Sequence, residues 1–283
     1  MDILEAMTVR RSVRTFTRRP ITALQAERIV AAISDAANPF GQTPDIKLIR
    51  FGEERDLRPS TYGMIRGACD YLAMGYGASE ADALAAGFAM EQVVLEATRM
   101  GLGTCWIAAT FRGSDFEGKA TWSREQPLKV VIPVGVAARK SLVERVARMA
   151  AGSDRRKPMD SLFFASGFTG PLCGDSPFYE ALAMMRLAPS STNSQPWRAA
   201  VKSASSVSVT ALARRSGRRR AQRGLFQPRH KQTVDARLRH RYLPFRHGRT
   251  RLRPLRQFHA PRRSPRPGRR VAVHHHIYQR INC

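Results

Sequence analysis

One helix limits the folds open to this chain more than any other feature does. Residues 79–100 have helical spacing, with apolar side chains on nearly every side: Ala81, Leu84, Ala85, Phe88, Met90, Val93, Val94, Leu95 and Ala97. A helix that is apolar almost all round is normally buried. Gly101-Leu102-Gly103 follows at once and is a typical helix C-terminus. The chain is therefore predicted to fold around this central helix.

Shorter patterns on both sides of the helix predict further elements. The β-branched run KVVIPVG at 129–135 is typical of a buried strand, and strands are also predicted at 46–51 and 69–75. Helices are predicted over four ranges: 2–7, 22–36 with Thr22 as N-cap, 158–164, and from a cap at Ser176 to Leu187. This mixture indicates an α/β or α+β fold.

The composition changes abruptly near residue 200. The whole chain has a net charge of +26, but from residue 201 onward 23 Lys and Arg face a single acid, Asp235. Residues 1–200 hold 25 basic and 21 acidic residues. All seven histidines lie beyond residue 200, and none of the ten methionines does. The basic character therefore belongs to the C-terminal part, where apolar residues are too sparse to offset the entropy of ordering.

The cysteines and the hydropathy indicate where the protein works. Cys69, Cys105, Cys173 and Cys283 lie far apart and form neither a CxxC pair nor a metal-ligand spacing. With no signal peptide, this pattern favours a reduced compartment, and we expect a cytoplasmic protein. No apolar run approaches the roughly 20 residues needed to span a bilayer.

Three short segments have residue types that suit ligand binding. The first is RRSVR at 10–14, whose guanidinium groups and hydroxyl suit a phosphate dianion, because Arg matches two phosphate oxygens at once. A solvated charged turn is the alternative.

Another segment is GLGTCWIAA at 101–109, where small residues let backbone N–H groups approach a flat ligand and Trp106 forms one wall of the site. A helix end followed by core is the alternative there.

The remaining segment is the decapeptide APSSTNSQPW at 188–197. Its hydroxyls and amides supply uncharged donors and acceptors, which suit the edge of a polar heteroaromatic ring or a ribityl-like chain. Pro189 and Pro196 limit the conformations that binding would have to freeze. An ordinary helix-to-strand loop remains the alternative interpretation.

Together these segments resemble the nitroreductase family of FMN-dependent oxidoreductases. RRSVRTF (10–16) looks like the family's phosphate-binding segment, PSSTNSQPW (189–197) like its flavin-edge loop, and MGLGTCWIAATF (100–111) like the segment beside the reactive flavin nitrogen. VVIPVG (130–135) and RRKP (155–158) follow in family order, so the resemblance covers roughly residues 1–200. It implies an α+β fold with a central mixed sheet flanked by helices.

The resemblance also implies roles for particular residues. Arg10, Arg11, Ser12 and Arg14 would hold the FMN phosphate and ribityl chain, with Arg156 as a further candidate for the phosphate. Ser190, Ser191, Asn193 and Gln195 would line the flavin, beside Trp106 and the N–H of Ala108 or Ala109. Hydride would pass from NAD(P)H through FMN to a small acceptor, nitroaromatic or quinone-like. No catalytic side chain and no metal site are predicted.

One departure from the family pattern predicts two fused repeats. The flavin-edge loop is expected within about thirty residues of the Arg segment, but AANPFGQTPDIKLIRF (36–51) is a degenerate copy, and the good copy arrives near residue 190. We therefore expect a pseudo-dimer in one chain with one composite flavin site. Residues 1–165 would form the first repeat, 166–203 the start of the second, and 204–283 a disordered Arg/Pro-rich tail.

The tail has two interpretations. Beyond residue 200 the chain contains no Met and no Glu, and it contains every His. This change predicts a shift of reading frame between about residues 198 and 206. Exposure of the central helix by the incomplete second repeat would then favour a homodimer. Alternatively, the protein is catalytically inactive or not an enzyme, and its basic arm binds nucleic acid without sequence preference. No specific nucleic-acid partner is expected.

Overall fold

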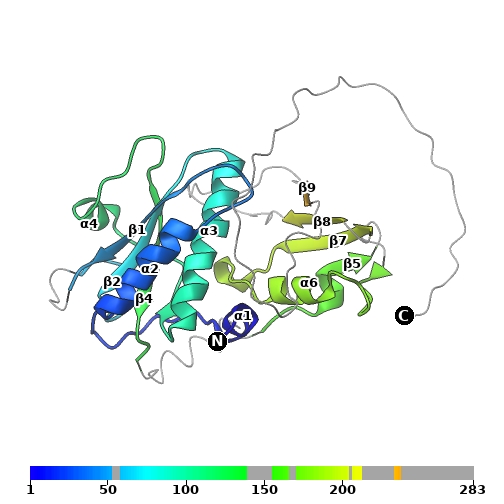
Figure 1. Cartoon of the computed structure of the whole chain (residues 1–283), viewed down its shortest axis with the longest axis horizontal. Helices are drawn as coiled ribbons and strands as arrows, with labels where there is room; N and C mark the ends of the chain where they lie inside the picture. Colours follow the sequence, from blue (N-terminus) through cyan, green and yellow to red (C-terminus); the bar gives the residue numbers. More distant parts are fainter. Residues whose placement is uncertain (53–57, 139–154, 166–169, 204–205, 212–232, 237–283) are drawn as a thin grey trace, which may run out of the picture.

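The computed structural model describes residues 1–52, 58–138, 155–165, 170–203, 206–211 and 233–236. These residues form helices and two separate β-sheets, which Figure 1 shows on either side of the short helix α1 (Ile3–Val9). The α+β class expected from the resemblance is confirmed. Where we expected one central mixed sheet, the strands are divided between two.

The first sheet contains four strands in the order β1-β2-β4-β3. These are β1 (Asp45–Arg50), β2 (Asp70–Gly75), β4 (Leu128–Gly135) and β3 (Gly103–Thr104), and every neighbouring pair is antiparallel. Every residue of the central strand β2 is buried. Leu72 is paired with both Leu48 of β1 and Ile132 of β4, so this row of side chains faces one common core.

Two helices cover one face of this sheet (Figure 1). α2 (Ala23–Asp35) and α3 (Glu80–Arg99) each begin with a capping box, from Thr22 to Gln25 and from Ser79 to Asp82. α3 buries Met90, Val93 and Val94 completely, which confirms the predicted central helix. Gly101 has φ of +76°, a left-handed conformation that ends the helix where the sequence predicts it.

An aromatic cluster covers the opposite face of the first sheet. Phe51, Tyr71 and Phe116 meet edge to face, with ring centroids between 5.3 and 5.6 Å apart. Phe116 belongs to the short helix α4 (Gly113–Glu117), and Phe16 joins the same core. The segment after Arg14 is therefore anchored by its first aromatic residue.

The second sheet has the order β6-β5-β7-β8-β9. Its strands are β5 (Phe163–Ala165), β6 (Gly170–Pro171), β7 (Trp197–Ser203), β8 (Ser206–Ala211) and β9 (Thr233–Ala236). β5 and β7 run parallel and the other pairs are antiparallel. Helix α6 (Tyr179–Arg186) contributes Leu182 to a core with Leu162 and Phe163.

Two predictions in this half are wrong. Residues 158–164 do not form a helix: one 3₁₀ turn, η2 (Met159–Ser161), leads into β5, because Phe163 and Phe164 pair with β7 and suit a strand. Ser176 does not cap α6, which begins at Tyr179. Instead the Ser176 carbonyl accepts a hydrogen bond from the Tyr179 N–H, in a turn that precedes the helix.

The boundary that we placed at residue 203 coincides with the last residue of β7. β8 lies past it and pairs with β7, and Val207 packs into the core of the second sheet. Apart from β8 and β9, the tail predicted over 204–283 lies outside the described residues. None of the described helices is both long and apolar enough to cross a membrane.

Candidate functional site

The Arg segment at 10–14 lies alongside the glycine-rich segment at 101–109. α1 ends at Arg10, and the chain then extends so that Ser12 forms a parallel bridge with Thr104. The Val13 N–H donates to the Thr104 carbonyl at 2.9 Å. Further on, Ile107 exchanges two hydrogen bonds with Val131 of β4. Two of the three segments singled out in the sequence are therefore neighbours.

Gly103 makes this close approach possible. A Cβ at position 103 would lie 2.6 Å from a methyl carbon of Val13 and 2.8 Å from its Cβ. Real side chains do not approach that closely, and the branched Val13 side chain has few other rotamers. The glycine is therefore needed to hold the Arg segment against β3.

Arg10 is buried at the start of this junction. Its side chain is only 5% exposed, and within the described part of the chain its Nη1 has no hydrogen-bond partner. Burial lowers the pKa of the Arg10 guanidinium, an effect that the nearby Glu91 carboxylate partly offsets. A buried, charged donor group without a partner is costly, so its position favours an anionic ligand.

Glu91 of α3 connects Arg10 to Trp106. Its Oε1 lies 3.9 Å from Arg10 Nε, and its Oε2 accepts a hydrogen bond from Trp106 Nε1 at 2.9 Å. Burial raises the pKa of the Glu91 carboxyl above its ordinary value, while Arg10 and the Trp106 N–H act in the opposite direction. These three side chains form what we call the Arg10–Glu91–Trp106 cluster.

The polar decapeptide forms a second cluster with residues 155–157. Arg156 Nη1 donates to Asn193 Oδ1 at 3.0 Å, and Asn193 Nδ2 donates to the Arg155 carbonyl at 2.8 Å. Gln195 Oε1 accepts from the Lys157 N–H at 2.8 Å. The Ser190 hydroxyl oxygen accepts from the Gln195 N–H at 2.9 Å. The loop is therefore held by its own polar side chains and by the basic segment.

The same loop has an unusual backbone. Thr192, Asn193 and Gln195 have φ between +45° and +53°, in the left-handed region that side chains other than Gly, Asn and Asp seldom adopt. Thr192 and Asn193 lie in the 3₁₀ turn η4 (Ser191–Asn193). Strain of this kind persists only where surrounding bonds impose it, and it gathers at functional sites.

Helix α1 contacts helices of both halves of the structure. It contacts α3 of the first half and α6 of the second, and in Figure 1 it lies between them. The Arg segment begins where α1 ends, and the decapeptide begins just after α6 ends. Both segments therefore leave helices that touch each other.

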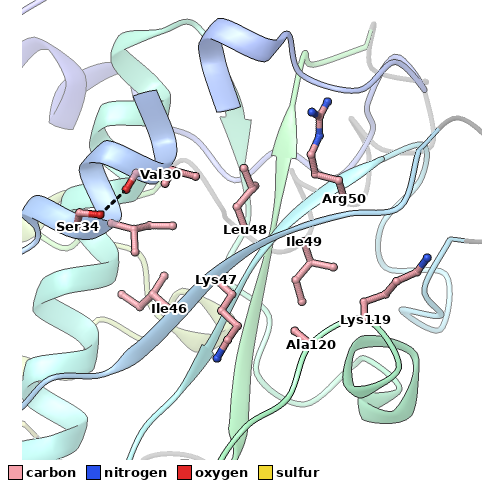
Figure 2. Close-up of a pocket in the computed structure, with 10 residues that line it drawn as sticks. Val30, Ser34, Ile46, Lys47, Leu48, Ile49, Arg50, Lys119 and Ala120 are labelled. Carbon is pink, nitrogen blue, oxygen red and sulfur yellow. Dashed lines mark hydrogen bonds between the residues drawn. The ribbon is translucent and has the colours of Figure 1, made fainter. Parts of the chain in front are cut away.

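A pocket on the first sheet is lined by other residues. It holds about 420 Å³ beside β1 and is lined by residues of α2, β1 and the 119–120 segment, as Figure 2 shows. Ile46 and Leu48 point to one side of the strand, and Lys47 and Ile49 to the other. It contains none of the residues predicted to bind a ligand. No group of three or more metal-ligating side chains occurs in the residues that the structure describes.

Comparison with known proteins decides the family. Residues 2–221 match the family model described as "Putative TM nitroreductase". The chain belongs to this nitroreductase family. The match includes the Arg segment, the glycine-rich segment and the decapeptide, and it continues beyond the region of resemblance that we identified from the sequence. No curated protein matches the chain.

Solved structures of nitroreductases resemble the fold more weakly. A "putative nitroreductase" from Thermotoga maritima is 21% identical, covers 75% of this chain and 76% of its own, and has a TM-score of 0.48. A nitroreductase with bound FMN from Bacteroides fragilis is 18% identical, covers 50% and 91%, and scores 0.40. An FMN-dependent nitroreductase from Clostridium difficile is 14% identical, covers 48% and 88%, and scores 0.40. Membership of the nitroreductase family is assigned from the family model alone.

The residues predicted to bind flavin differ in how the nitroreductase fold places them. Arg10, Ser12 and Trp106 lie in or beside one cluster, and Arg156, Ser190, Asn193 and Gln195 lie in the other. Arg11 turns back onto α1, donating to the carbonyls of Thr8 and Arg10. Of the remaining predicted residues, Arg14 and Ala108 are half-buried and Ser191 is exposed.

Sequence reasoning missed two residues of these clusters. Lys157 stands beside Arg156 in the basic run, and its Nζ donates to the Ser194 carbonyl at 2.8 Å. Glu91 is an acid within the helix that we interpreted as apolar nearly all round, and this exception was the available signal. A carboxylate on a largely buried helix needs a partner, and Arg10 and Trp106 supply it.

Proposed function

We propose that this nitroreductase-family chain is an FMN-dependent oxidoreductase that takes hydride from NAD(P)H and reduces a nitroaromatic or quinone-like acceptor. One observation carries the proposal: among the described residues, the buried Arg10 guanidinium has a donor without a partner, two positions before Ser12, which bridges Thr104. A phosphate group supplies the charge and the acceptor oxygens that this donor lacks. Membership of the nitroreductase family supports the same ligand.

The residues present fit a flavin mononucleotide. Arg10, Ser12 and Arg14 would hold its phosphate and ribityl chain, with Arg11 and Arg156 as further cations. The side chains of Ser190, Ser191, Asn193 and Gln195 would line the flavin, because neutral donors and acceptors match the edge of its ring system. Trp106 and the backbone at Ala108 would lie beside the ring.

The order of elements supports a composite site from two repeats. In the first half a helix, a loop and two antiparallel strands follow one another as α2, 36–44, β1 and β2. The second half repeats this order with α6, 187–196, β7 and β8. We therefore propose that residues 1–165 supply the phosphate-binding Arg segment and that the repeat beginning at 166 supplies the polar loop.

The chain's own contribution is binding and orientation. FMN, when bound, would supply two-electron chemistry, so that a hydride from NAD(P)H could pass to the acceptor. Reducing a quinone to a hydroquinone takes that hydride and one proton, which solvent can supply. Residues 1–200 contain no histidine, and none of their acids is assigned to this proton transfer. We further propose that the enzyme is cytoplasmic, because its widely spaced cysteines form no CxxC pair.

An anaerobic redox cycle tests this function. The full chain is loaded with FMN, and NADH or NADPH is added while the flavin absorbance is followed. The proposal expects the absorbance to bleach and then to return when a quinone is added in excess. Arg14→Ala should lower the amount of flavin retained and leave the spectrum of the remainder unchanged. Retained flavin that neither nicotinamide reduces would overturn the proposal.

A further inference from the structure

Glu91 lies between the Arg segment and the glycine-rich segment of the proposed flavin site. Each of its carboxylate oxygens faces a different segment: Oε1 faces Arg10, and Oε2 accepts the Trp106 N–H. The side chain is 29% exposed, compared with 5% for Arg10. The acid Glu91 therefore lies next to Arg10, the first residue of the segment that we expect to bind an anion.

The contact with Arg10 balances charge without using the donors of the guanidinium. At 3.9 Å, the distance from Arg10 Nε to Glu91 Oε1 is longer than a hydrogen bond. Opposite charges still attract at this distance, and burial strengthens the attraction. Arg10 therefore remains charge-balanced while its Nη1 stays without a hydrogen-bond partner among the described residues.

A phosphate held by Arg10 would be close to the Glu91 carboxylate. Both groups are anionic, and in a partly buried site their repulsion is screened only weakly. Glu91 also attracts the same guanidinium that the phosphate needs. Both effects weaken the binding of the anion, whereas neither acts on an uncharged ligand.

We propose that Glu91 is a positioning residue that lowers the affinity of the flavin site for the cofactor's phosphate while it holds Arg10 and Trp106 in place. This inference rests on the proposed function, because it concerns the same site. It implies a flavin that exchanges more readily than the Arg segment alone would permit.

Glutamine at position 91 separates the charge from the shape. Its amide oxygen can still accept the hydrogen bond from Trp106 Nε1, but it carries no charge. The groups that face Glu91 are Arg10 from the Arg segment, with Arg11 beside it, and the uncharged Trp106 indole from the glycine-rich segment. Glu91→Gln therefore changes one charge in this cluster and little else.

The test compares two flavins that differ only in the phosphate. Dissociation constants of FMN and riboflavin are measured at pH 8 for the full wild-type chain, for Glu91→Gln, and for Glu96→Gln. Glu96 is on the same helix and pairs with Arg28 and Arg99 instead. We expect Glu91→Gln to bind FMN about tenfold more tightly, to leave riboflavin binding within a factor of two, and Glu96→Gln to change neither.

A double variant distinguishes this role from a general structural one. In an Arg10→Gln background, Glu91→Gln should change the ratio of FMN to riboflavin affinity by less than in the wild-type background, because competition for the guanidinium is gone and only the direct repulsion remains. Flavin binding with an unchanged ratio in Glu91→Gln would overturn this inference alone. If the wild-type chain bound neither flavin, the proposed function and this inference would both be overturned.

Discussion

Arg156 Nη1 donates a hydrogen bond to Asn193 Oδ1 at 3.0 Å, and Asn193 in turn donates to the carbonyl of Arg155. Asn193 thus joins the basic segment to the polar loop. Its own φ is +53°. Both its side chain and its tolerance of a left-handed backbone are used at this position.

Substitutions at Asn193 should separate these two properties. Asn193→Gly keeps the left-handed backbone and loses only the side-chain bonds, so FMN affinity should fall by about tenfold. Asn193→Ala adds backbone strain of about 1 kcal/mol, so its thermal unfolding temperature should fall below that of Asn193→Gly. Equal unfolding temperatures for the two variants would contradict the left-handed loop.

The contact between Gly103 and Val13 predicts a repairable defect. Gly103→Ala places a Cβ against the Val13 side chain, and we expect the free energy of unfolding to fall by about 1–3 kcal/mol. Adding Val13→Ala should recover part of that loss, because it removes the two methyl carbons in conflict and leaves only the Cβ, 2.8 Å away. Urea unfolding of the single and double variants measures both effects.

Gly87 supplies the matched control for this pair. It lies inside α3, and a Cβ there would meet nothing within 4 Å. Gly87→Ala should therefore stabilise the protein by up to about 1 kcal/mol through helix propensity. If Gly103→Ala behaved like Gly87→Ala, the Arg segment would not lie against β3.

The raised pKa of Glu91 predicts how stability depends on pH. Burial makes the folded state hold this proton more tightly than the unfolded chain does. The resulting stabilisation is complete below the unfolded pKa, about 4.3, and is lost as pH rises through the raised folded value. Glu91→Gln, always neutral, should therefore gain in free energy of unfolding relative to wild type as pH rises from 4 to 8. If the free energy of unfolding depended on pH in the same way for both proteins, burial would not raise the pKa of the Glu91 carboxyl.

The change in residue usage after residue 200 predicts a shift of reading frame. One alternative frame downstream of the Trp197 codon should encode a helix and strands patterned like residues 79–135. β8 pairs with β7 as far as Ala211, and the family match reaches residue 221, so family-like sequence persists past the predicted window. If neither alternative frame of the gene encodes such a pattern, the prediction fails.

Elements defined by neighbouring residues were predictable from the sequence. The bounds of α3 follow from Ser79 and Asp82 at its start and Gly101 at its end. Each of these residues lies within one turn of the end that it defines. The Arg segment and the glycine-rich segment were recognisable because each carries its residue types within a few positions. Their contact through Val13 and Thr104 is new information from the structure.

Features that depend on distant partners were not predictable in the same way. β5 is a strand because Phe163 pairs with Ala199, and nothing local to 158–164 indicates that partner. Glu91 gains its significance from Arg10 and Trp106, which reach it from two other segments. The division of the strands between two sheets likewise depends on long-range pairing.

The most direct test of the account is a titration of the full chain with FMN, followed by flavin absorbance, for wild type and Arg10→Gln. If the buried guanidinium holds the cofactor's phosphate, wild type should bind FMN and Arg10→Gln should bind it about 10- to 100-fold more weakly, while riboflavin affinity stays the same. FMN affinity that is unchanged by Arg10→Gln, or a wild-type chain that retains no flavin after free FMN is removed, would contradict the account.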